Sequence, residues 1–359
     1  MPTIAIHRLY SHQLEQPLYH TPADIVAHLG AVQAQEYAVT KWSLALRSHG
    51  LTDDAIEAAM TDGSIIRTHL LRPTWHFVAA TDIRWMLALT APRVDAINGT
   101  MYRKFELDDA LFARANAVIE AALQGGVQLT REALGAALKL NGISADGMRL
   151  SYIVMRAELD AVVCSGARHG KHFTYALLET RAPQGTPISR DQALATLTLR
   201  YFTSHGPATV HDYAGWSGLT IADCTLGIEM NKSQLEHTDS DEKTYWWNPA
   251  QVVPDSPPRR AYLLPVYDEY LLAYRDRRAS LDPAYADYWM RFGEMFTSTI
   301  VIAGRVVGLW RRDLKGRSVV VITLKRFTSF TDEEQILVND AAQRFADFLN
   351  LKLMLTWAD

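Results

Sequence analysis

The sequence predicts a helix-rich α+β protein that contains three similar units and a different C-terminal domain. The first observation is a pattern of two amphipathic helices followed by two short β segments, which recurs three times before about residue 255. Beyond that point, alternating apolar residues predict mostly strands. Two helices joined by a turn, with a β-hairpin after them, make a winged helix. We therefore expect three tandem winged-helix modules and a C-terminal β-rich domain.

The first winged helix is expected in residues 1–100. Its first helix begins at Pro22, because proline suits the first turn and Thr21 before it is a typical N-cap residue. A second helix over 53–62 ends at a glycine. Two segments rich in β-branched and aromatic residues, within 64–79, then predict a hairpin that forms the wing.

The second and third winged helices are expected in residues 101–185 and 186–255. The second begins with LTREALGAALKL and continues with a long helix over 147–166, after which AVVCSGAR and KHFTYALL form a wing. The third begins with the helix DQALATLTLRYFTSHG. Its wing is expected in the polar segment over 235–247.

The C-terminal β-rich domain is expected in residues 256–359, after a Pro-rich linker at 255–260. Alternating apolar residues on either side of a turn at Gly316 predict a hairpin. Residues 259–326 hold 13 Lys or Arg against 7 Asp or Glu, so this domain is basic in an otherwise acidic chain. A final helix is expected over 332–353.

Composition excludes several classes of protein. The 359 residues are 48% apolar and 21% charged, which is typical of ordered globular proteins and excludes disorder. A net charge of −4 means that any site for nucleic acid must be a local basic patch. No apolar run approaches the roughly 20 residues of a membrane helix, and no secretory signal is visible at the N-terminus. Since Cys164 and Cys224 are too few for a disulfide framework, we expect reduced thiols and a cytoplasmic protein.

The familiar catalytic and cofactor motifs are absent. His169 with His172, and His69 with His76, lack the Cys or carboxylate partners that zinc sites need. No glycine loop of the phosphate-binding kinds occurs, and Ser217 lacks the spacing of a nucleophile elbow. We expect neither a metal nor an organic cofactor.

The segment LGAVQAQEYAVTKW contains two glutamines separated by one alanine. In extended backbone Gln33 and Gln35 point to one side, whereas in a helix they are about 200° apart. A shared site therefore requires irregular backbone after Gly30. Spacing alone also allows a second interpretation, in which both amides, and Glu36 beside them, are simply hydrated on a surface turn.

At this point the sequence resembles the AlkZ/YcaQ-like bacterial DNA glycosylases. The stretch LGAVQAQEY and the following LTDDAIEAAMTDGSIIRTHLLRPTWHFVAATDIRWMLALTAPR are similar to the first winged helix of that family. RYFTSHGPATVHDYAGWSGL, LLPVYDEYLLAYRDRR and IAGRVVGLWRR match its later parts. The family motif is Gln, an apolar residue, then Gln or Asp, and here it falls on Gln33, Ala34 and Gln35.

The resemblance implies a monofunctional, monomeric DNA glycosylase that hydrolyses the N-glycosidic bond of N-alkylated purines in duplex DNA and can unhook interstrand crosslinks. It implies no obligate protein partner and no membrane. A purine alkylated at N7 or N3 already carries positive charge, so the enzyme mainly has to position water. We expect the amide oxygens of Gln33 and Gln35 to accept hydrogen bonds from that water.

DNA contact requires cations, and the basic candidates form two clusters: Arg275, Arg277 and Arg278, and the hairpin residues Arg311, Arg312, Lys315 and Arg317. Each arginine could instead form a salt bridge with a nearby acid. Trp75 and Trp310 could face DNA, although alternating apolar strands favour core positions. Asp268 could be a capping acid or a site residue.

A rival hypothesis comes from another class of protein. A non-catalytic winged-helix regulator could keep the fold with an idle glutamine pair. Regulators of this kind normally dimerise to read spaced half-sites, whereas a repair enzyme binds duplex DNA as a monomer with little sequence preference.

Overall fold

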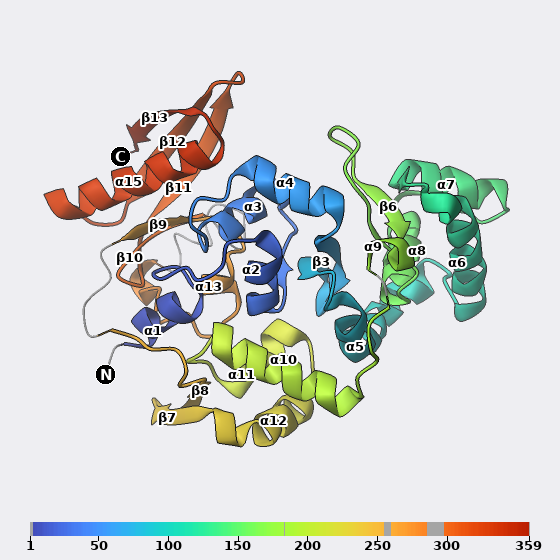
Figure 1. The fold of residues 1–359 in the computed structure, drawn as a ribbon, viewed down its shortest axis with the longest axis horizontal. Coiled ribbons are helices and arrows are strands. Elements are labelled where there is room, and N and C mark those ends of the chain that lie inside the picture. Colours follow the sequence, from blue (N-terminus) through green and yellow to red (C-terminus); the bar gives the residue numbers. More distant parts are fainter. Residues whose placement is uncertain (1–2, 183, 255–259, 286–297, 359) are drawn as a thin grey trace.

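The computed structural model describes residues 3–182, 184–254, 260–285 and 298–358. Helices and strands are mixed along the whole chain, and three small sheets and one five-stranded sheet are spread through the molecule (Figure 1). The helix-rich α+β character predicted from the sequence is therefore confirmed. No helix within the described ranges has both the length and the apolar character to cross a membrane.

The first unit places the glutamine segment at the edge of a three-stranded sheet of order β1-β3-β2. The predicted helix from Pro22 is present, and the Thr21 side chain accepts a hydrogen bond from the amide of Asp24. The short strand that carries Gln33 and the helix after it were not predicted. The elements are α1 (Ile4–Ser11), α2 (Pro22–Leu29), β1 (Val32–Gln33), α3 (Tyr37–Ala45), α4 (Asp53–Asp62), β2 (Ile65–Leu70) and β3 (Arg72–Ala79).

The second unit again combines helices with a three-stranded sheet, of order β4-β6-β5. The predicted long helix ends at Leu159, because Ala161 has a left-handed backbone (φ 58°) and β5 follows directly. The elements are α5 (Ile83–Lys104), α6 (Asp109–Leu123), β4 (Leu129–Thr130), α7 (Arg131–Leu140), α8 (Gly147–Leu159), β5 (Val163–Ser165), β6 (Thr174–Leu177) and α9 (Leu178–Arg181).

The third unit is helical and carries the predicted two-stranded hairpin. Its helices begin at capping residues, and both Ser189 and Thr209 form a complete capping box. The elements are α10 (Arg190–Ser204), α11 (Val210–Ser217), α12 (Ile221–Met230), β7 (Glu236–Ser240) and β8 (Lys243–Trp247).

The C-terminal part forms a five-stranded sheet of order β13-β12-β11-β10-β9, with one long helix packed on it (Figure 1). The elements are β9 (Ala261–Leu264), α13 (Glu269–Leu272), β10 (Thr299–Ile302), β11 (Arg305–Lys315), β12 (Val319–Arg326), α15 (Asp332–Phe348) and β13 (Lys352–Trp357). The hairpin at Gly316 is confirmed. The expected helix over 332–353 is wrong at its end, since residues 352–357 pair in parallel with β12. Most of the expected linker, 255–259, lies outside the described residues.

The hydrophobic cores do not coincide with the separate units, because two of them each join one unit to another. The indole of Trp42 in α3 packs against Phe345 and Phe348 of α15, and its Nε1 donates to the carbonyl oxygen of Leu263 (2.7 Å). One continuous cluster of buried residues therefore joins the first unit to the C-terminal sheet. A second cluster joins the sheet of the first unit to the helices of the third.

Candidate active site

Gln33 lies at the end of β1, where four segments of the chain meet. Its side chain is 6% exposed, and its strand pairs with β3 in register with His76. After Ala34, whose amide still bonds to the carbonyl of Trp75 (2.7 Å), the backbone bends at residues 35 and 36 before α3 begins. The irregular backbone that a shared glutamine site requires is therefore present.

Four residues form a closed circuit of hydrogen bonds around Gln33. The Gln33 amide N–H donates to Glu269 Oε1 (2.8 Å), and Trp216 Nε1 donates to Glu269 Oε2 (3.0 Å). Arg72 Nη2 donates to Gln33 Oε1 (3.0 Å), and Arg72 Nη1 donates to the carbonyl oxygen of Trp216 (2.7 Å). We call Gln33, Arg72, Trp216 and Glu269 the glutamine circuit. They come from β1, β3, α11 and α13 respectively.

Close backbone contacts bring these segments together. A Cβ atom on Gly218, at the left-handed end of α11 (φ 72°), would lie 2.1 Å from the carbonyl oxygen of Leu71. Only glycine allows α11 to approach the β2–β3 turn so closely. A Cβ on Gly30 would lie 3.2 Å from the ring of Trp216. The glycine before β1 thus seats the indole beside Gln33.

The charged side chains near Gln33, Arg72 and Glu269, have opposite signs and are largely shielded from solvent. Burial lowers the pKa of Arg72, and the nearby carboxylate of Glu269 partly offsets this effect. His76, opposite Gln33, is buried, and burial holds its pKa well below the ordinary value. Its Nδ1 bonds to the carbonyl of Thr74 (2.9 Å), which leaves Nε2 as a buried atom without a partner. The site therefore contains one half-buried cation, one buried carboxylate and a neutral imidazole.

Gln35 differs from Gln33 in its surroundings. Its side chain is exposed and makes no hydrogen bond within the described part of the chain, and Glu36 beside it is exposed too. The structure thus presents one buried, fixed amide and one free amide two residues later. A free side chain can adapt to a bound molecule, whereas the buried one cannot turn without breaking its bonds.

The other face of the same sheet carries a second polar cluster. Arg67 Nε donates to the carbonyl oxygen of Ala34 (3.0 Å), and its guanidinium lies over the rings of Trp75 and Phe173. Burial lowers the pKa of Arg67 to about 10. His69 Nδ1 lies 2.5 Å from Glu158 Oε2. Trp75 is therefore half-buried in a polar stack and does not stand free on the surface.

The basic candidates for DNA contact fall on two separate elements. On the β11–β12 hairpin, Arg311, Lys315 and Arg317 are exposed. Arg312 is half-buried over the ring of Phe345, and burial lowers its pKa. Arg312 is therefore a weaker candidate than its neighbours.

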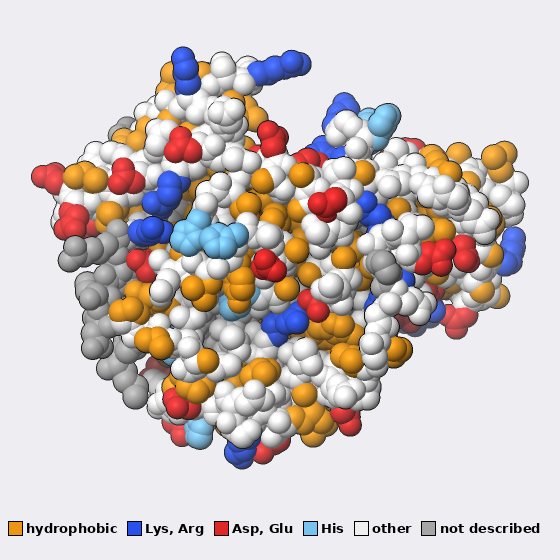
Figure 2. Space-filling model, viewed as in Figure 1, with side chains coloured by type: hydrophobic (Ala, Val, Ile, Leu, Met, Phe, Trp, Pro, Cys, Tyr) orange, Lys and Arg blue, Asp and Glu red, His pale blue; other side chains and the backbone are white. Residues whose placement is uncertain are grey.

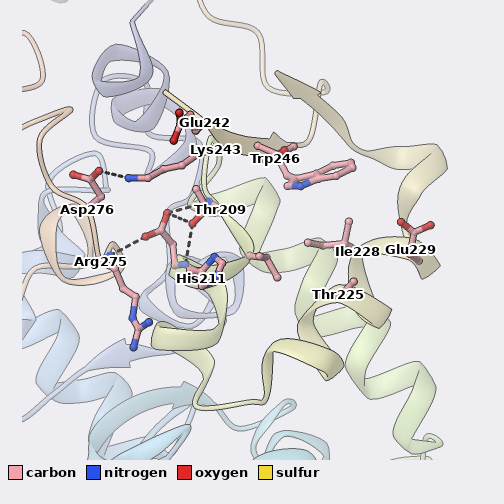
Figure 3. Close-up of a pocket in the computed structure, with 13 residues that line it drawn as sticks. Thr209, His211, Thr225, Ile228, Glu229, Glu242, Lys243, Trp246, Arg275 and Asp276 are labelled. Atoms are coloured by element: carbon pink, nitrogen blue, oxygen red, sulfur yellow. Dashed lines mark hydrogen bonds and ion pairs between the residues drawn. The ribbon is translucent and has the colours of Figure 1, made fainter. Parts of the chain in front are cut away.

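The cluster after α13 borders a pocket of about 460 Å³ between α11, α12 and the β7–β8 hairpin (Figure 3). Arg278 binds Asp276, which also binds Lys243, so the alternative of a salt bridge applies to Arg278. Arg277 Nε donates to the carbonyl oxygen of Leu271 (2.9 Å). In Figure 3 the guanidinium of Arg275 extends away from Asp276. Arg275 is exposed, and its guanidinium forms no ion pair with the described residues.

Several other candidates have structural roles. Asp268 caps α13 and binds Arg47 through both carboxylate oxygens, and Trp310 is buried with its Nε1 bonded to the carbonyl of Leu264 (2.8 Å). Cys164 and Cys224 are free and buried. Among the residues that the structure describes, no group of three or more His, Cys, Asp or Glu side chains is placed to hold a metal ion.

The fold of this chain is that of a DNA glycosylase. The fold matches the solved structure of the Streptomyces sahachiroi DNA glycosylase AlkZ with a TM-score of 0.82, over 99% of this chain and 98% of that one, at 21% identity. A curated relative from the same organism, the interstrand DNA cross-link repair glycosylase, is 23% identical over 92% of this chain and 91% of its own length. The family model of AlkZ-like DNA glycosylases matches residues 26–348, so the chain belongs to that family.

Arg72, Trp216 and Glu269 were not singled out from the sequence. Arg72 lies within the predicted hairpin, and Glu269 lies within the segment LLPVYDEYLLAYRDRR. Glu269 is 236 positions away from Gln33 along the chain, so no local pattern connects them. The one signal in the sequence is the pair of adjacent carboxylates, Asp268 and Glu269, between two tyrosines.

Proposed function

We propose that this enzyme excises N-alkylated purines from duplex DNA and unhooks interstrand crosslinks, with Gln33 and Gln35 ordering the attacking water. The named activity of the curated relative supports the crosslink part of this proposal. The reaction needs neither a metal nor an organic cofactor, and we expect a monomer that acts in the cytoplasm without an obligate protein partner.

The observation that carries the proposal is the contrast between the two amides. Gln33 is fixed in the buried glutamine circuit, and Gln35 is exposed at the bend that follows. Bonds among buried polar groups hold a side chain in one orientation. An oriented amide next to a free one, both neutral, suits a water molecule better than it suits strong acid or base catalysis.

The chemistry of the substrate explains why neutral groups suffice. An N7- or N3-alkylated purine leaves as a neutral base, so its glycosidic bond breaks through a sugar with oxocarbenium character and without strong acid assistance. The enzyme then has to place water at the sugar carbon and exclude competing orientations. An unmodified purine leaves less readily, and this difference contributes to the choice of lesion.

Duplex DNA would be held by basic arms. In Figure 2, two tips rise on either side of a hollow at the top of the view, and both carry Lys or Arg side chains. One tip is the β11–β12 hairpin with Lys315 and Arg317, and the other is the β5–β6 loop with Lys171 and His172. We further propose that the three units with helices and a hairpin act as tandem winged helices that follow the phosphate backbone.

The decisive experiment measures release of free base from duplex DNA that contains N7-alkylguanine, under single-turnover conditions. We expect wild-type enzyme to release the lesion and leave undamaged duplex intact. Gln35→Ala and Gln33→Met should each slow release by about 10² to 10³, as loss of one positioned hydrogen-bonding group typically does. Their affinity for duplex should stay within twofold of wild type.

Wild-type rates of excision in both single variants would refute the assignment of Gln33 and Gln35. A lack of base release by wild-type enzyme, together with tight binding to undamaged duplex, would instead support the non-catalytic regulator.

A further inference from the structure

We propose that Arg72 is a positioning residue that fixes the Gln33 amide so that its nitrogen, and not its oxygen, faces the reacting water. The inference rests on the proposed function of the glutamine pair and divides the work within it. Gln33 then acts as a hydrogen-bond donor, and Gln35 is the acceptor.

The orientation of the Gln33 amide follows from the chemistry of its partners. A guanidinium group has N–H donors and no acceptor, so the atom 3.0 Å from Arg72 Nη2 must be the amide oxygen. The Thr74 hydroxyl also lies within bonding distance of that oxygen (3.4 Å). Since the amide oxygen has two lone pairs, these two donors occupy it. This differs from the expectation that both glutamine oxygens accept hydrogen bonds from water.

The amide nitrogen of Gln33 is the group left over. It makes no hydrogen bond within the described part of the chain, yet it is not among the buried polar atoms that lack a partner. It therefore reaches the surface, although the residue as a whole is 6% exposed. What Gln33 offers to a bound molecule is an N–H donor.

Arg72 itself is held from the opposite side. Its Nη1 donates to the last carbonyls of α11, those of Gly215 (3.3 Å) and Trp216 (2.7 Å), which lie at the negative end of the helix dipole. The guanidinium group of Arg72 thus connects the third unit to the first. Meanwhile Glu269 holds both the backbone of Gln33 and the indole of Trp216, so neither end of the glutamine can shift independently.

The consequence for the reaction is a complementary pair of amides. A water molecule can accept a hydrogen bond from Gln33 Nε2 and donate one to the amide oxygen of Gln35, which leaves a lone pair for the sugar carbon. As the C–O bond forms, the C–N bond to the alkylated base breaks, the base leaves neutral with the electron pair, and the water releases a proton to solvent. If Gln33 were free to flip, half of its orientations would present an oxygen instead. Arg72 removes that alternative before the substrate binds.

Three substitutions test the two halves of the proposal. Gln33→Glu keeps an oxygen for Arg72 but replaces the N–H donor with a second oxygen. We expect it to be as slow as Gln33→Met, about 10² or more below wild type. Arg72→Met frees the glutamine, and we expect a 10- to 100-fold slower single-turnover rate with duplex affinity within twofold. Arg72→Lys, which still donates to one acceptor, should recover part of the rate.

Arg181 provides the matched control. Like Arg72, it bridges two units by donating to backbone carbonyls, those of Met60 and Thr61, but it does not contact Gln33. Arg181→Met should lower the melting temperature without changing the rate of base release. A double variant of Arg72 and Gln33, both to Met, should be no slower than Gln33→Met alone, because the two groups act as one unit.

The outcomes separate this inference from the proposed function. Full activity of Gln33→Met would overturn both. If Gln33→Met is slow but Gln33→Glu is as fast as wild type, Gln33 works as an acceptor and the donor assignment is wrong. If Arg72→Met retains the wild-type rate, or its effect adds to that of Gln33→Met, Arg72 does not position the glutamine. Should Arg72→Met fail to fold, Gln33→Glu and Arg72→Lys still decide.

Discussion

Asp268 and Arg47 form an ion pair that is almost wholly buried beside the candidate active site. The Arg47 side chain is 0% exposed and that of Asp268 is 1% exposed, and Ser43 donates a further hydrogen bond to the carboxylate (2.6 Å). Asp268→Asn leaves the guanidinium without a negative partner. We expect it to lower the free energy of unfolding at pH 7 by about 3 to 5 kcal/mol, measured by urea denaturation.

The pH dependence of this pair gives a second test of the same substitution. Burial alone would raise the pKa of Asp268, but the charge of Arg47 and its hydrogen bonds outweigh burial, and the pKa lies below the ordinary value. The pair therefore stabilises the fold above the unfolded pKa of about 3.9 and loses this effect as the pH falls through the folded pKa. In the Asp268→Asn variant, this pH-dependent contribution to the free energy of unfolding should be absent. Asp146→Asn, in an exposed pair with Lys139, serves as the control and should cost less than about 1 kcal/mol.

At the scale of residues, the sequence identifies Gln33 and Gln35 but not the side chains that hold Gln33 in place. The motif lies in three consecutive residues, so a resemblance to a family reveals it. The two circuit residues that bond to Gln33 directly, Arg72 and Glu269, lie 39 and 236 positions away, and their roles depend on how α11 and α13 pack. Contacts of such long range leave no pattern in a single sequence.

The β11–β12 hairpin is the element whose charge we expect to matter most for DNA affinity. Replacing Arg311, Lys315 and Arg317 by Gln should weaken binding to damaged and undamaged duplex alike. If all three contact phosphates, the slope of log affinity against log salt should flatten by up to about 2.7. Arg312 is left in place because it packs on Phe345.

A control with the same change in net charge keeps this result specific. Arg103, Lys104 and Arg114 are exposed on α5 and α6, and their replacement by Gln should leave the salt slope unchanged. An unchanged slope in the hairpin variant, with circular dichroism like that of wild type, would move the DNA path to other elements.

Elements with their own local signals were predicted well. Thr21, Thr52, Thr130 and Thr331 each cap a helix where the sequence indicates one, because a capping bond involves only neighbouring residues. Strand β13 was not predicted, and its first two residues were assigned to the end of the preceding helix. Its alternation over six residues is short, and it becomes a strand because the edge of β12 lies beside it.

At the scale of the whole molecule, buried histidines predict how stability depends on pH. Burial lowers the pKa values of His12, His76 and His205, so these rings stay neutral in the folded state. Below the unfolded pKa of about 6.5 the unfolded chain binds more protons, so stability must fall as the pH decreases. We expect the urea midpoint to drop between pH 7.5 and pH 5.5. A midpoint that stays constant over this range would contradict the prediction.

The shared core has a consequence for synthesis of the protein on the ribosome. Gln33 is made early, but the carboxylate that binds its amide and the aromatic residues that cover Trp42 follow more than 200 residues later. Until those residues emerge, the first unit exposes an apolar surface and an incomplete site. We therefore expect the nascent chain to need protection by chaperones, and the candidate site to become complete only after α13 and α15 have emerged from the ribosome.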